Sequence, residues 1–189
     1  MNYPEKKTNM AFLAVAVLIE LSLLLTGQTG WDMLQYAILG IVLLVVSIID
    51  YYFYVIPDKL LVAALALYIL LSALAGDSLL EIGSCLILQG VLASLPLLLF
   101  VLLADFITGM ETMGFGDIKL FYVLGVYLGA AKACLTLFLA CIVALIWNVI
   151  LLHHKKRQMF PFGPSISIAA WLVILWGKPV LEWYTGLWG

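Results

Sequence analysis

Long apolar runs constrain the fold of this chain more than any other feature. Seven runs approach the length of a membrane-spanning helix, at residues 10–26, 32–49, 60–75, 79–104, 118–131, 133–152 and 164–176. A span needs about 20 mainly apolar residues, because the hydrocarbon core of a bilayer is about 30 Å thick. The fifth and seventh runs are short for this distance. The pattern predicts an all-α, polytopic membrane helix bundle with about six to seven transmembrane helices.

Composition points to the same class of protein. The chain is 66% hydrophobic and 11% charged, whereas soluble domains are about half apolar and about a quarter charged. The connections between the runs are too short for a separate soluble domain, so we expect a single domain over residues 1–189. We expect the lipid bilayer as its surroundings and no nucleic-acid partner. Cys85, Cys134 and Cys141 lie in apolar runs without metal-ligand spacing, so we expect no metal site and no cofactor.

The basic residues predict an orientation in the membrane. A cytoplasmic N-terminus would place seven of the nine basic residues inside and only two outside. Cytoplasmic loops carry an excess of Lys and Arg, so we expect a multi-pass protein of the cell membrane in this orientation. The inside set is Lys6, Lys7, Lys59, Lys119, Lys155, Lys156 and Arg157, and the outside pair is Lys132 and Lys178.

Two aspartates then fall on the same, cytoplasmic face. Asp50 lies at the end of the second run, in IIDYYFYVIPDKL, and Asp117 lies at the start of the fifth, in TMGFGDIK. Two carboxylates brought together in a partly dry site share one proton, which leaves one acid and one base near neutral pH. Such a pair can activate water and protonate a leaving amide nitrogen. The sequence therefore predicts peptide hydrolysis by an Asp50/Asp117 dyad.

The residues around Asp117 suit an active-site loop. Gly114 and Gly116 flank Phe115, and residues without side chains permit unusual backbone angles and close approach of another backbone. An extended substrate can pair with such an exposed backbone edge. The alternative is an ordinary glycine-rich turn with Asp117 as a helix cap. For Lys119 we expect mainly a topological role, with neutralisation of a nearby acid or phospholipid binding as alternatives.

Three further acidic residues have open roles. We expect Asp58, after Pro57, to cap the third helix, and Glu111 to lie in a solvated loop. The alternative for both is binding of a basic substrate segment. Glu20 lies mid-span in the first run, where an ionisable side chain is costly. It either has a function or forms a structural hydrogen bond to another helix.

Small residues and prolines predict two features of packing. Gly125 and Gly129 form a small-xxx-small face that would let the fifth helix pack tightly and hold Asp117 in place. The PFGP segment at 161–164 breaks the chain before the last helix. It forms a rigid re-entry that we place close to the active site.

Three segments resemble the motifs of one family. GMETMGFGDIKLFYVLGVYLG at 109–129 resembles the G-x-E-x-M-G-x-G-D-x-K-L signature of type IV prepilin peptidases, which are membrane aspartyl proteases of the GxGD type. IIDYYFYVIPDKL at 48–60 resembles their first aspartate motif, and FPFGPSISIAAWL at 160–172 resembles their late PFGP segment. The matches occur in the family's order and cover residues from about 45 to 175.

The resemblance implies an activity and a substrate class. It implies that Asp50 and Asp117 are the catalytic pair, and that the enzyme removes a short basic leader from prepilin-like or pseudopilin-like precursors at the cytoplasmic face. Met110 and Thr112 stand where the signature often has Arg and Gly, a departure expected to alter leader contacts rather than chemistry. Larger members carry an N-terminal segment with paired CxxC motifs, linked to methylation of the new N-terminus. This sequence has no such motif, so we expect a peptidase without S-adenosylmethionine-dependent methyltransferase activity.

Three alternatives remain at the level of sequence. A proton-coupled transporter or channel would use Glu20, Asp50 and Asp117 as a relay, which requires carboxylates at several depths of the bilayer. A presenilin-like intramembrane protease also uses G-x-G-D, but this chain lacks the Tyr-Asp pair and the late Pro-Ala-Leu of that class. An assembly factor without catalytic activity is the third.

Overall fold

The computed structural model describes residues 30–109, 113–153 and 162–187. These parts are almost entirely helical and contain no strand, which confirms the predicted all-α class. The elements in chain order are α2 (Trp31–Phe53), α3 (Asp58–Ala75), α4 (Leu79–Ser84), a π-helical segment (Cys85–Gln89), α5 (Gly90–Thr108), α6 (Phe115–Leu128), α7 (Ala130–His153) and α8 (Gly163–Gly186).

Five helical stretches of the described residues are long and apolar enough to cross a membrane: Trp31–Phe53, Asp58–Ala75, Leu79–Thr108, Ala130–Val149 and Gly163–Gly186. They confirm a polytopic bundle. The expected first span, 10–26, lies outside the described residues. The expected fifth span is α6, whose 14 residues cover only about 21 Å at about 1.5 Å per residue. It is therefore too short to cross the bilayer by itself.

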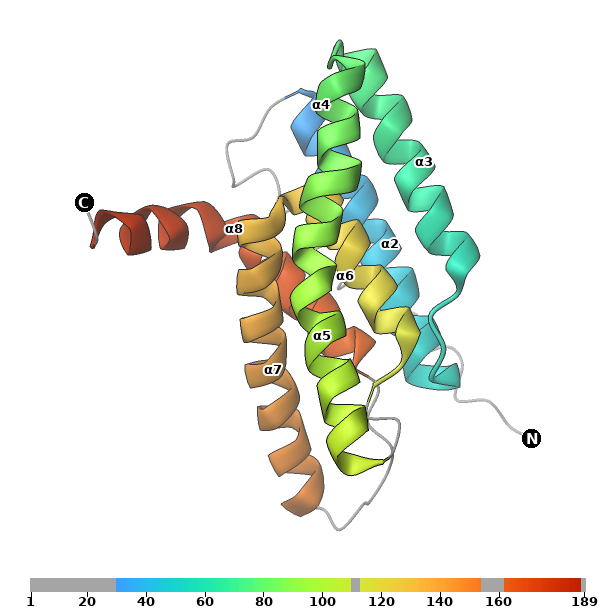
Figure 1. The fold of residues 1–189 in the computed structure, drawn as a ribbon, viewed down its shortest axis with the longest axis vertical. Helices are drawn as coiled ribbons and strands as arrows, with labels where there is room; N and C mark the ends of the chain where they lie inside the picture. Colours follow the sequence, from blue (N-terminus) through green and yellow to red (C-terminus); the bar gives the residue numbers. More distant parts are fainter. Residues whose placement is uncertain (1–29, 110–112, 154–161, 188–189) are drawn as a thin grey trace, which may run out of the picture.

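The central position in the bundle belongs to this short helix. It packs against α2, α3, α5, α7 and α8, and Figure 1 shows it enclosed by its neighbours. Leu120, Phe121 and Leu124 are completely buried. A helix so enclosed has little freedom to shift, because protein interiors are close-packed. Phe115, Gly116 and Asp117, at its start, precede this packed part and are exposed or half-buried.

Small residues allow α6 to cross α5 at short range. A Cβ built on Gly125 would overlap the Ala93 side chain and lie 2.6 Å from the Gln89 carbonyl oxygen. A Cβ on Gly90 would lie 2.7 Å from the Tyr122 ring. The expectation of tight packing at Gly125 is confirmed. For Gly129 it is wrong, because this residue ends α6 with a φ of 82° and does not belong to the helix face.

A π-helical turn joins α4 to α5 and anchors two other helices. The Tyr122 hydroxyl of α6 donates a hydrogen bond to the Leu86 carbonyl oxygen at 2.6 Å. The Ala130 N–H at the start of α7 donates to Gln89 Oε1 at 2.8 Å. The wider turn leaves carbonyl groups without their usual partners in the helix, which makes them available to side chains such as Tyr122.

The helices alternate in direction, so the connections gather at two ends of the bundle. The ends of α2 and α5 and the starts of α3, α6 and α8 lie at one end, the lower end in Figure 1. Lys59 and Lys119 belong to this end. Lys132 belongs to the opposite end, where its Nζ lies 5.8 Å from the centre of the Tyr36 ring near the start of α2. This grouping of the three lysines agrees with the expected one.

The last helix is longer than its apolar run. The run ends at 176, but α8 continues to Gly186, and its final part extends away from the other helices in Figure 1. Lys178 and Glu182 end the apolar run. They do not end the helix, which continues through Lys178, Pro179 and Glu182 with their side chains exposed.

Candidate functional site

Asp50 lies in the last turn of α2 and is only 6% exposed. Its Oδ2 accepts a hydrogen bond of 2.8 Å from the backbone N–H of Gly163, the first residue of α8. The first N–H groups of a helix have no partner within that helix, and they attract negative charge. The side chain of Asp50 therefore caps α8 from another helix, and this contact fixes the direction of its carboxyl group.

Gly163 must be a glycine for this contact to form. A Cβ at this position would lie 2.7 Å from Asp50 Oδ2 and 3.0 Å from the Asp50 Cβ and Cγ atoms. Beside it, the Ser167 hydroxyl donates to the Leu43 carbonyl oxygen at 3.0 Å, which joins α8 to α2 a second time. The segment that the sequence placed close to the active site does reach Asp50. The hydrogen bond from Gly163 was not foreseen, and the only sequence signal for it was the glycine within PFGP.

Asp117 lies in the first turn of α6, at the same end of the bundle as Asp50. It precedes the buried part of α6 and lies outside the five spans. Burial disfavours its charged form and is the main cause that raises its pKa to about 7; the charge of Asp50 raises it further. The structure thus brings the two aspartates to one end of the bundle, within electrostatic reach of each other.

Neither glycine before Asp117 has a positive φ, and it is Gly116 that allows a close approach to another segment. Gly114 precedes α6 in an ordinary extended conformation. A Cβ on Gly116 would lie 3.0 Å from the Ile56 Cβ, so this glycine lets α6 approach the α2–α3 connection closely. Phe115 is 67% exposed. The alternative in which Asp117 caps α6 is wrong, because Gly114 occupies the cap position and there is no side-chain cap bond.

The expectation that Asp58 caps α3 is also wrong. Pro57 occupies the cap position, with no side-chain cap bond, and Asp58 is the first residue of the helix. Its two oxygens face Lys119, whose Nζ lies 2.7 Å from Oδ1 and 2.9 Å from Oδ2. For Lys119 the structure supports neutralisation of a nearby acid, one of the two alternatives to a topological role. Its topological role stays a prediction.

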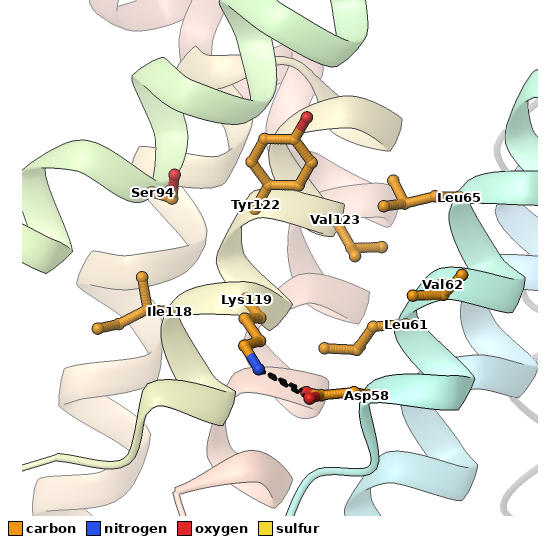
Figure 2. A pocket seen from close by; sticks show the side chains of 9 residues that line it. All are labelled: Asp58, Leu61, Val62, Leu65, Ser94, Ile118, Lys119, Tyr122 and Val123. Atoms are coloured by element: carbon orange, nitrogen blue, oxygen red, sulfur yellow. Dashed lines mark hydrogen bonds and ion pairs between the residues drawn. The ribbon is translucent and has the colours of Figure 1, made fainter.

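A cavity of about 420 Å³ opens beside this ion pair, between α3, α5 and α6. Figure 2 shows the ion pair at one end of the cavity and mainly apolar side chains around the rest. The lining residues are Asp58, Leu61, Val62, Leu65, Ser94, Ile118, Lys119, Tyr122 and Val123. Glu111 and Glu20 lie outside the described residues. Within the parts of the chain that the structure describes, no three His, Cys, Asp or Glu side chains form a metal-binding group.

The fold and the site together define a polytopic helical membrane protein with two acidic side chains, from two different helices, at one end of the bundle. Comparison with known protein families shows which membrane protein family the chain belongs to. Residues 37–149 match the sequence model of the type IV leader peptidase family, and the chain belongs to that family. This match confirms the family resemblance inferred from the three motifs. Membership of a peptidase family supports the prediction that the chain is a protease.

Similar proteins carry the same kind of description. The prepilin leader peptidase/N-methyltransferase of Aeromonas salmonicida is 33% identical over 186 residues, which cover 96% of this chain and 60% of that protein. The Aeromonas hydrophila protein of the same name is also 33% identical, over 96% of this chain and 61% of its own length. The Stutzerimonas stutzeri protein of the same name is 31% identical, over 75% of this chain and 49% of its own length. The chain thus spans about 60% of the length of the first two relatives. No solved structure matches it.

Proposed function

We propose that this chain is an aspartic endopeptidase of the membrane, which removes the leader from prepilin-like or pseudopilin-like precursors at the cytoplasmic face. One observation carries the proposal. Asp50 and Asp117 come from different helices, yet both lie at one end of the bundle, and the charge of Asp50 raises the pKa of Asp117. Membership of the leader peptidase family supports the substrate class.

The reaction needs one proton shared by the two carboxyl groups. The ionised carboxylate removes a proton from a water molecule, whose oxygen attacks the scissile carbonyl carbon. The protonated carboxyl group donates its proton to the carbonyl oxygen as the tetrahedral intermediate forms. When the C–N bond breaks, the proton taken from water passes to the leaving amide nitrogen, and a hydroxyl proton of the intermediate returns to the other carboxylate, which restores the shared proton. The Gly163 N–H keeps Asp50 Oδ2 directed throughout, so the other oxygen of Asp50 remains available for the reaction.

The position of the site suits a leader that stays in the cytoplasm. The positive-inside rule assigns the end that carries Lys59 and Lys119 to the cytoplasm, and this end also carries both aspartates. Glu111 is the proposed contact for a basic leader. Asp58 is a weaker candidate for that role, because its carboxylate already faces the Lys119 ammonium group.

The transporter alternative requires a different arrangement. A proton relay needs carboxyl groups at successive depths of the bilayer. Asp50 and Asp117 instead share one end of the bundle, and Glu20, the third member of the proposed relay, lies outside the described residues. We therefore favour the peptidase.

The proposal is tested by co-expression with a prepilin of Aeromonas hydrophila and a gel-mobility assay for loss of the leader. Asp50→Asn and Asp117→Asn should each lower processing by at least about 100-fold, since a positioned acid or base contributes about that much or more. Asp32→Asn is the matched control, because Asp32 is exposed at the other end of α2. Normal processing by either dyad variant would show that the catalytic assignment is wrong.

A further inference from the structure

The two motif segments that carry the aspartates are joined by an ion pair. Asp58 follows the connection that leads from Asp50 into α3, and Lys119 lies two residues after Asp117. Nζ of Lys119 contacts both oxygens of Asp58, at 2.7 and 2.9 Å (Figure 2). We propose that Asp58 and Lys119 are a positioning pair, which sets the place of the Asp117 carboxyl group relative to Asp50. This inference rests on the proposed peptidase function.

The start of α6 needs such an anchor. Gly114 at its cap position has no side chain to hold the turn, and the Phe115 side chain is 67% exposed. Gly116 lies against Ile56, which is in the α2–α3 connection two residues before Asp58: a Cβ on Gly116 would lie 3.0 Å from the Ile56 Cβ. The ion pair and the Gly116–Ile56 contact therefore join the same two segments. One contact fixes their separation, and the other limits rotation of the first turn.

The exposure of the pair separates its effect on catalysis from its effect on folding. The side chains of Lys119 and Asp58 are 53% and 64% exposed. Exposed ion pairs contribute little to the stability of a protein, because water screens both charges. Misplacement of a catalytic group by about 1 Å, in contrast, lowers a rate by up to about 100-fold. Loss of the pair should therefore leave the fold intact and slow the reaction.

Three other roles make different predictions. If Asp58 bound a basic leader directly, its removal would raise KM. If Lys119 bound a lipid phosphate or only marked topology, the effect of removing Lys119 would not depend on Asp58. A positioning pair predicts instead that kcat falls for either single variant, and that the two charges can exchange places.

The experiment compares D58N, K119M, K119R and the exchange variant D58K/K119D, each as the full chain purified in detergent. The substrate is the same Aeromonas hydrophila prepilin. We expect kcat to fall roughly 10- to 100-fold in D58N and K119M with KM little changed. K119R keeps the charge and should stay near the wild-type rate. The exchange variant should be at least about tenfold faster than either single variant. K59M is the matched control, which removes a neighbouring lysine of the same end.

A second measurement does not depend on activity. Hydrogen–deuterium exchange of residues 113–121 should become faster in D58N and K119M, and should return toward the wild-type rate in D58K/K119D. If hydrogen–deuterium exchange of 113–121 were unchanged in both D58N and K119M, the positioning role would be overturned. A catalytic rate of D58K/K119D no faster than that of D58N would overturn it too. Failure of the wild-type chain to cleave the prepilin would count against the proposed function, whereas the exchange measurement would still decide on the pair.

Discussion

At the scale of single residues, Asp50 shows how another helix can fix the direction of a carboxyl group. A side chain at the end of α2 could turn toward several neighbours. The Gly163 N–H, at the start of α8, selects one direction through a hydrogen bond of 2.8 Å. An N–H group at a helix start is a strong donor to a carboxylate, because it has no competing partner in its own helix.

Gly163→Ala should disrupt this arrangement. The added Cβ would lie 2.7 Å from Asp50 Oδ2, so the carboxyl group must turn or α8 must move. With Asp50 in the proposed catalytic pair, we expect prepilin processing to fall by about 100-fold, because a catalytic group displaced by about 1 Å loses about that much rate. Gly83→Ala is the control, because a Cβ at Gly83 meets no atom within 4 Å. Processing at the wild-type rate by Gly163→Ala would mean that the contact does not position Asp50.

The pKa of Asp117 predicts a dependence on pH. Its value of about 7 means that this group retains a proton well above the ordinary pKa of about 4. The folded chain then binds more protons than the unfolded chain between about pH 4 and 7, so the free energy of unfolding falls as pH rises through this window. Above about pH 7 most Asp117 carboxyl groups lose this proton, which the proposed mechanism requires, so kcat should decline. A pH–rate profile that stays level up to pH 9 would contradict this.

The influence of Asp50 on Asp117 is measurable separately. Asp50→Asn removes a nearby negative charge, so the pKa of Asp117 should fall below 7. It should remain above its ordinary value, because burial is the larger cause of the shift. Infrared titration of the carboxyl band, taken as a difference against Asp117→Asn, measures this. An unchanged titration midpoint would show that the two groups do not interact.

At the scale of elements, the short helix α6 is the part on which the site depends. It does not need to cross the bilayer, because the surrounding helices supply its apolar environment. It begins at the same end of the bundle as Asp50 (Figure 1) and ends at Gly129, whose φ of 82° turns the chain directly into α7 at Ala130. A short enclosed helix holds a catalytic group more firmly than a loop does, because its backbone is hydrogen-bonded and its side chains are packed.

Gly125→Ala should destabilise the crossing of α5 and α6. The new Cβ would overlap Ala93 and lie 2.6 Å from the Gln89 carbonyl oxygen, so the two helices must separate. Overpacking of this kind costs about 1–3 kcal/mol. Thermal unfolding in detergent should show a lower Tm for this variant. Gly186→Ala, where the Cβ meets nothing within 4 Å, should leave the Tm unchanged. A wild-type Tm for Gly125→Ala would show that the crossing can relax without cost.

At the scale of the whole molecule, the alternating directions of the helices bring the two aspartates and the basic residues Lys59 and Lys119 to the same end of the bundle. The chain returns to this end between α2 and α3, between α5 and α6, and at the start of α8 (Figure 1). Each return supplies one part of the site: Asp50, Asp117 and Gly163. A bundle of this kind can assemble a site from distant segments, since its helices are spaced by direct packing and its loops all meet at two surfaces.

Cysteine labelling tests the orientation of the bundle. In a chain without Cys85, Cys134 and Cys141, a membrane-impermeant maleimide added to intact cells should label Asp77→Cys and should not label Lys59→Cys. Asp77 lies in the α3–α4 connection, at the end opposite the aspartates, and both residues are exposed. Labelling of Lys59→Cys from outside would reverse the orientation and place the site on the wrong face for a cytoplasmic leader.

The sequence alone determined that the chain forms a helical bundle and that Asp50 and Asp117 lie at the same end of it. Apolar runs must become helices in lipid, where every backbone N–H and C=O needs a partner, and successive helices must alternate in direction. Tertiary structure decided what those rules leave free. The Gly163–Asp50 bond, the Lys119–Asp58 pair and the enclosure of α6 depend on how helices distant in the chain pack. Such contacts arise from three-dimensional fit between side chains, and neither hydrophobicity nor charge along the chain specifies that fit.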